Sequence, residues 1–115
     1  MADSVKTRTQ LIHRAAKLLA LIEPGEAPST EDYNSLDGLI DTLIAQLAAD
    51  QIYYVSDPDN IELEIFEPLA RLLANTSGPD FGSPINEVAQ ARDEQILRRL
   101  ASAPPTYQTL KAEYF

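Results

Sequence analysis

The 115-residue sequence contains no cysteine and no tryptophan, and it has a single histidine. Without cysteine, the chain forms neither disulfides nor cysteine-based metal sites. No apolar run approaches the roughly 18 residues that a membrane-spanning helix needs. The opening MADSVKTRTQ also lacks the apolar stretch of a signal peptide. We therefore expect a protein that stays in the compartment where it is made and has no membrane contact.

Positive charge is also scarce, and it is unevenly placed. Residues 23–67 carry twelve of the eighteen Asp and Glu side chains and no Lys or Arg, within a chain of net charge −9. An acidic surface repels phosphates, so tight or sequence-specific DNA binding is not expected. The acids either keep a small protein soluble or let nucleic acid pass without sticking.

Two segments in the first half have clear helical periodicity. Thr7 and Gln10 have the form of a capping box, and the apolar face that follows ends at Glu23-Pro24-Gly25. Ser29 caps a second helix, which we expect to run from about Thr30 to Asp50. The apolar positions of the two segments are Leu11, Ala15, Leu18, Leu19 and Ile22, then Tyr33, Leu36, Ile40, Leu43 and Leu47.

The second half predicts a connector and two further helices. Residues 52–55 (Ile-Tyr-Tyr-Val) are β-prone, and they form either an extended connector or a strand that pairs with a neighbouring copy through Tyr53 and Tyr54. A third helix begins between Ile61 and Glu64 and ends near Asn75. Pro68 lies inside it, so this helix either starts late or is kinked.

A fourth helix is predicted from Pro84 to about Ser102, with Ser83 as its N-cap. Its expected inner face consists of Ile85, Val88, Ala89, Ile96, Leu97 and Leu100. The sequence thus predicts an all-α fold: a four-helix bundle over residues 1–102, with a short extended connector and an extended C-terminal arm over residues 103–115. A chain of this length has room for one such core.

The sequence offers no credible catalytic site. His13 lacks a second histidine or a cysteine as a partner, so we interpret it as a surface or interface residue. The stretch Asp57-Pro58-Asp59-Asn60 lacks the glycine and glutamate of a calcium-binding EF-hand loop, and we interpret it as a turn. The four glycines form no phosphate-binding loop. We expect no enzyme activity, no cofactor and no metal site.

The C-terminal decapeptide is the feature that a helical core does not explain. It holds three of the eight aromatic residues of the chain. The segment either folds back over its own helices or docks on another subunit, since Tyr and Phe are favoured anchors for such contacts. Its candidate anchors are Tyr107, Leu110, Tyr114 and Phe115.

The order of several segments resembles a known protein family. The first is a K-T-[KR]-x-x-L-[IV]-x-x-A-x-[KR] pattern that begins at Lys6. A break with proline and glycine follows, and then a helix that opens with Asp32 and contains Leu36-Asp37 and Leu39-Ile40-Asp41. After an extended linker comes an alanine-containing helix that leads to Pro79-Asp80-Phe81-Gly82. Over residues 6–102 this arrangement is similar to the head-to-tail adaptors of tailed bacteriophages, of the packaged-DNA-stabilisation or tail-accessory type.

The resemblance implies a structural role in the virion neck, after synthesis in the host cytoplasm. Such adaptors are helical and assemble, usually as twelve copies, into a ring beneath the portal protein. The ring extends the DNA channel, retains the packaged DNA without specific binding and provides the platform for tail proteins. The C-terminal segment of such adaptors commonly contacts the portal, which implies that role for residues 103–115.

A rival function from another class also fits the composition. A small acidic helical module, such as an inhibitor, would capture a basic protein with its acidic face. The two functions differ in their partner, since the first requires a portal ring and the second a basic protein.

Overall fold

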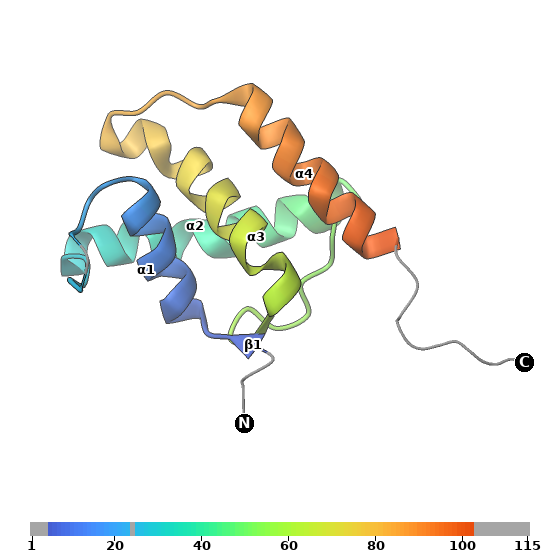
Figure 1. Ribbon diagram of the computed structural model, residues 1–115, viewed down its shortest axis with the longest axis horizontal. Helices are drawn as coiled ribbons and strands as arrows, with labels where there is room; N and C mark the ends of the chain where they lie inside the picture. The colour runs from blue at the N-terminus through green and yellow to red at the C-terminus, as the bar shows by residue number, and fades with distance from the viewer. Residues whose placement is uncertain (1–4, 24, 103–115) are drawn as a thin grey trace, which may run out of the picture.

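The computed structural model describes residues 5–23 and 25–102, and they form four helices (Figure 1). The all-α prediction is confirmed, with the addition of a two-stranded sheet of two residues per strand. In chain order the elements are β1 (Val5–Lys6), α1 (Arg8–Leu18), α2 (Thr30–Ala49), β2 (Ile61–Glu62), α3 (Leu63–Ser77), the 3₁₀ helix η1 (Gly78–Phe81) and α4 (Glu87–Ser102).

The two N-terminal caps form as the sequence predicts. The Gln10 N–H donates to Thr7 Oγ1 at 3.1 Å, and the Thr7 N–H donates to Gln10 Oε1 at 2.8 Å. At the start of α2, the Asp32 N–H donates to Ser29 Oγ at 3.1 Å. These bonds satisfy N–H groups that have no partner within their own helices, and they fix where both helices begin.

Helix α1 ends four residues earlier than the apolar pattern indicates. The Leu21 N–H donates to the Ala16 carbonyl and the Ala20 N–H to the Lys17 carbonyl, both at 3.0 Å. This is a Schellman C-cap, in which Ala20 takes the left-handed conformation at φ 60°. The early end leaves Leu18 exposed, so its expected place on the inner face was wrong.

Helix α2 ends in the same way, and this ending turns the chain back to the core. Gln51 has φ 58°, and the Ile52 N–H donates to the Leu47 carbonyl at 2.9 Å. Ile52 and Val55 are both buried. Within the described residues the segment 52–55 forms no strand, and its pairing with a neighbouring copy stays a prediction. The small sheet lies elsewhere, where Val5 and Lys6 pair antiparallel with Glu62 and Ile61.

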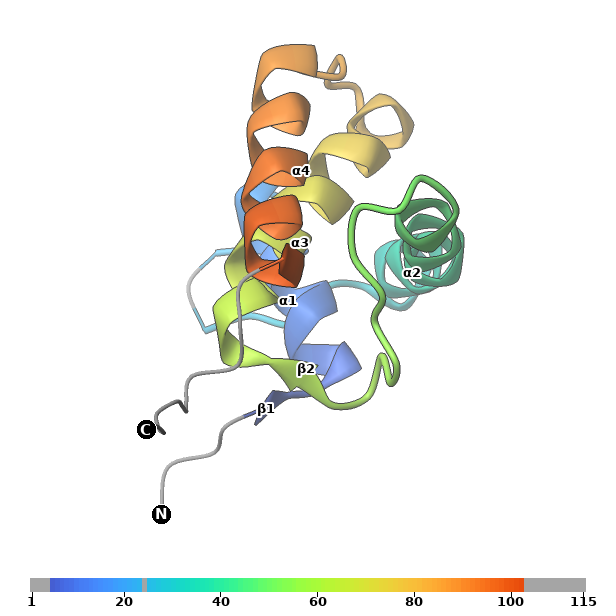
Figure 2. The same ribbon diagram turned by 90° about the vertical axis from the view of Figure 1, so that its right-hand side faces the viewer.

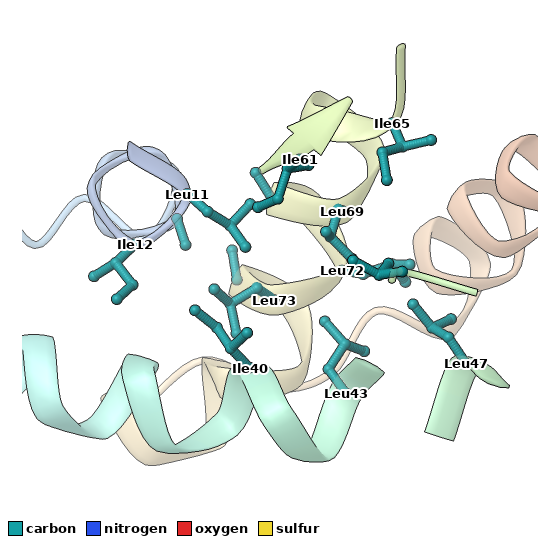
Figure 3. Close-up of a cluster of buried hydrophobic side chains, with 14 of the residues drawn as sticks. Leu11, Ile12, Ile40, Leu43, Leu47, Ile61, Ile65, Leu69, Leu72 and Leu73 are labelled. Atoms are coloured by element: carbon teal, nitrogen blue, oxygen red, sulfur yellow. The ribbon is translucent and has the colours of Figure 1, made fainter. Parts of the chain in front are cut away.

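Helix α3 lies at the centre of the molecule and contacts each of the other three helices. Figure 3 shows Ile40, Leu43 and Leu47 of α2 pointing towards Leu69, Leu72 and Leu73 of α3, with Leu11 of α1 and Ile61 of β2 closing the cluster. Pro68 is the sixth residue of α3 and is buried. The helix begins at Leu63, within the predicted range from Ile61 to Glu64, and it continues through the proline, so of the two alternatives the late start was wrong.

Helix α4 begins at Glu87, later than the predicted Pro84. Asn86 caps it instead, because its Oδ1 accepts the Ala89 N–H at 3.1 Å. The Asn75 side chain holds the cap in place, since its Nδ2 donates to the Asn86 carbonyl and its Oδ1 accepts the Asn86 N–H, both at 2.8 Å. Ser83 and Pro84 lie in the connection before this cap.

Gly78 is required where α3 passes into η1. The Ser83 N–H donates to the Gly78 carbonyl at 2.8 Å, and a Cβ on Gly78 would lie 2.8 Å from the Ser83 carbonyl oxygen. We expect Gly78→Ala to lower the free energy of unfolding by about 1–3 kcal/mol, because the backbone must move to relieve the overlap. Urea denaturation measures this change.

Gly38 provides the matched control for that substitution. It lies inside α2, and a Cβ there would meet nothing within 4 Å. Gly38→Ala should raise stability by about 0.5–1 kcal/mol through the helix propensity of alanine. If Gly78→Ala proves as harmless as Gly38→Ala, the close approach of Ser83 does not constrain the fold.

Candidate interaction surfaces

The two tyrosines that the sequence suggested as a subunit interface have different environments. Tyr53 is half-buried, and its hydroxyl donates to Glu62 Oε1 at 2.6 Å. Burial and the Glu62 carboxylate both raise the pKa of the Tyr53 phenol above its usual value, so this side chain stays neutral. Tyr54 points outward with 74% of its surface exposed. Tyr53 thus contributes to its own subunit, and only Tyr54 presents a free aromatic side chain.

A shallow groove lies beside Tyr54. Its volume is about 260 Å³, and it is lined by residues from the C-terminal part of α2, the connector and the last turn of α4, namely Ala48, Gln51, Ile52, Tyr53, Tyr54 and Ala101. The exposed aromatic ring and this groove together offer a contact surface at the end of α4. Tyr53 lines the same groove, so both tyrosines stay candidate contact residues.

The start of α4 and the connection before it present a second exposed apolar surface. Ile85 and Val88 were expected on the inner face, but they are 45% and 79% exposed. Ile85 precedes the helix, which begins at Glu87. Val88 is exposed because α4 meets the rest of the bundle mainly through α3, and that contact buries only Asp93 and Leu97 of α4. An isolated exposed aliphatic side chain is ordinary. Val88, however, lies on the same face of α4 as Arg92 and Arg99.

Ion pairs connect the helices, and sequence reasoning did not identify them. Arg14 of α1 donates to Glu67 of α3 from Nε and Nη2, the shortest distance being 2.6 Å. Arg71, one turn further along α3, lies 3.9 Å from Glu67 and donates from Nε to Asp93 Oδ1 of α4 at 2.9 Å. The hydrogen bond from Arg14 lowers the pKa of the Glu67 carboxyl and keeps it charged.

The inward position of Asp93 has a signal in the sequence. Asp93 follows Ala89 and precedes Leu97 at steps of four residues, so it lies on the helix face that Leu97 buries. Its side chain is only 2% exposed. A buried carboxylate requires a partner, and Arg71 is the one that the fold supplies.

A third arginine joins α1 to α2. Arg8 donates to Asp37 Oδ1 at 2.6 Å, to Asp41 Oδ1 at 3.0 Å and to the Asp37 carbonyl at 2.9 Å. The hydrogen bond to Asp41 is the main cause that raises the pKa of Arg8, and the same bond lowers the pKa of Asp41. The N-terminal bases thus offset part of the acidic charge of α2 within one subunit.

His13 and the Asp57–Asn60 stretch make contacts that belong to the fold. The His13 ring meets the Tyr33 ring edge-on at 6.5 Å, and it lines a groove of about 440 Å³ together with Lys6, Lys17 and Phe66. Asp57 closes a turn by accepting the Asp59 N–H at 2.9 Å and the Asn60 side-chain amide at 2.8 Å. Across residues 5–23 and 25–102, no group of three or more His, Asp or Glu side chains is placed to hold a metal ion.

The proposed docking arm, residues 103–115 with Tyr107, Leu110, Tyr114 and Phe115, lies outside the described residues. Among the helices that the structure describes, none combines the length and the apolarity that a membrane crossing needs. Comparisons with protein-family models, curated proteins and solved structures give no match to this chain.

Proposed function

We propose that this chain is a structural adaptor of a tailed-bacteriophage virion that forms a ring beneath the portal and joins the head to the tail. In this role the ring extends the DNA channel, helps to retain the packaged DNA and carries the tail proteins. The observation that carries the proposal is the order of sequence segments from Lys6 to Gly82 that resembles such adaptors. The protein performs no chemistry in this function.

The positions of those segments in the fold support the proposal. Thr7 of the first segment caps α1. Arg8 of the same segment binds α1 to Asp37 of the second segment. The Pro79–Gly82 segment forms the tight turn after α3, where Gly82 takes φ 85° and the Phe81 side chain packs against the core. Each segment of the resemblance therefore has a definite place in holding the bundle together. A ring subunit needs such a self-sufficient body to present its contact surfaces.

The first test is the interaction with a portal. Purified chain mixed with intact portal rings or virion necks should give a stoichiometric complex, seen as added density at the portal by electron microscopy. If no complex forms while the portal stays intact, the adaptor function is excluded. A salt-sensitive complex with a basic protein, without affinity for the portal, would instead favour the acidic binding module.

The tail has its own expected result. Deleting Thr106–Phe115 should abolish portal binding but leave helicity and melting temperature nearly unchanged, because the buried core described above is built from residues 11–97. Circular dichroism and co-sedimentation with portal measure the two effects.

A full-length chain with the last ten residues in shuffled order provides the matched control, because it keeps length, charge and composition. A large drop in melting temperature on deletion would show that the tail belongs to the core. Full portal binding by the shuffled chain would show that Tyr107, Leu110, Tyr114 and Phe115 are not specific anchors.

A further inference from the structure

The exposed face of α4 carries a stripe of side chains that form no salt bridge in the described part of the chain. Val88, Arg92, Gln95 and Arg99 follow one another at steps of four, three and four residues, so they lie along one side of the helix. All four are exposed, and Val88 is the most exposed large apolar residue of the described chain. We call this set the α4 stripe.

The arginines of α4 differ from the other arginines of the chain. Arg8, Arg14 and Arg71 each form salt bridges within the subunit, whereas Arg92 and Arg99 form none among the described residues. Arginine next to an exposed apolar side chain is a typical composition for an interface centre, since the guanidinium is weakly hydrated and binds carboxylates in defined geometry. The α4 stripe therefore fits an acidic protein surface.

The outer face of α2 has the complementary charge. Its exposed residues include Glu31 and Asp41, and no Lys or Arg occurs between residues 23 and 67. The Asp41 side chain is bound to Arg8 but keeps 73% of its surface exposed. Beside these acids the surface carries the small residues Gly38, Thr42 and Ala45, which do not obstruct an approaching helix.

These two faces do not meet within one molecule. Figure 2 shows α2 and α4 on different sides of α3, which contacts both of them, and their C-terminal ends share the groove beside Tyr54. A contact between the α4 stripe and an α2 face therefore requires two copies. A head-to-tail contact of this kind repeats from copy to copy, and it forms a closed ring when the rotation between neighbours closes.

We propose that the α4 stripe of one copy docks on the outer face of α2 of the next copy. The charge complementarity of the two faces carries the inference, and the exposure of Val88 supports it. The inference rests on the proposed function only in taking ring neighbours as the partner. It assigns the subunit contact to helix faces, separately from Tyr54 and from the C-terminal segment.

Charge exchange is the sharpest test. Arg92→Glu/Arg99→Glu reverses the α4 stripe, and Glu31→Lys/Ala45→Lys reverses the α2 face. Each variant alone places like charges in the contact, so its association constant should fall on the order of tenfold or more. An equimolar mixture should regain wild-type association, because every contact between unlike variants pairs opposite charges again. Sedimentation velocity of the full chain over a concentration series measures this.

The matched control for the α4 variant is Lys6→Glu/Lys17→Glu, which makes the same change of charge on β1 and α1, away from the stripe. It should associate like the wild type. Salt alone is a weaker test, since it screens both this attraction and the repulsion between copies of net charge −9. Circular dichroism checks that each variant keeps its helices, and Arg92→Glu alone serves as a milder variant if the double change unfolds α4.

Three results would overturn the inference. They are a wild-type chain that stays monomeric at every concentration, an Arg92→Glu/Arg99→Glu variant that associates normally, and a mixture that fails to restore association. The portal experiment fails or succeeds separately. A chain that associates through these faces but ignores the portal refutes the adaptor function alone, and portal-bound rings of the charge-reversed variants refute the helix contact alone.

Discussion

Leu73→Ala is expected to lower the free energy of unfolding by about 2–5 kcal/mol, the cost of a cavity in a packed core. Leu73 is fully buried in α3, where that helix meets both α1 and α2. The loss combines the transfer free energy of the removed atoms with contacts that the rigid neighbours cannot replace. Denaturation in urea, followed by circular dichroism, measures the change.

Leu63→Ala is the control for this substitution, because Leu63 belongs to the same helix but is 45% exposed. The change should cost less than about 1 kcal/mol, since little apolar surface leaves a packed environment. Equal losses for the two substitutions would mean that the packing around Leu73 is loose. The same result would contradict the central position of α3 in the core.

Asp93→Ala should destabilise the protein by about 1–3 kcal/mol, the range for losing a hydrogen bond to a charged partner. The substitution removes the carboxylate that accepts the Arg71 Nε–H and leaves the guanidinium one-third exposed, with Glu67 at 3.9 Å. Because Leu97 is the other buried residue of α4, the loss should loosen that helix first. Hydrogen exchange should show faster exchange in α4 than in α2.

A double-mutant cycle separates the pair from its surroundings. If Arg71 and Asp93 act together, the loss from the double alanine variant is smaller than the sum of the single losses. Glu94→Ala is the neighbouring control, since Glu94 accepts only the Gln90 side-chain amide at 3.2 Å. A coupling near zero would show that the buried carboxylate does not hold α4 on α3.

The sequence predicted correctly the features that depend on contacts within a few residues. The caps formed by the Thr7 and Ser29 hydroxyls follow from hydrogen-bond geometry over one helical turn. The buried apolar face of α2 follows from the spacing of its residues. The sequence also located the turn at Asp57, where the side chain itself closes the loop. Ala20 and Gln51 gave no such signal, because alanine and glutamine rarely take the left-handed conformation that ends these helices.

The exposure of individual side chains did not follow from the sequence, because it depends on distant neighbours. Tyr53 and Tyr54 look equivalent in the sequence, yet one donates to Glu62 and the other faces outward. Val88 fits an apolar helix face as well as Leu97 does. Only the position of α3 decides that Leu97 is covered.

By itself, the sequence determined an all-α chain with four helices and capped starts to α1 and α2. It also determined an acidic segment, residues 23–67, that contains no Lys or Arg. The tertiary structure alone decided which charges are paired. Arg14, Glu67, Arg71 and Asp93 come from three helices, and their contacts arise only when those helices pack. The physical reason is that helix caps act over one turn of chain, whereas burial and ion pairing depend on which faces meet.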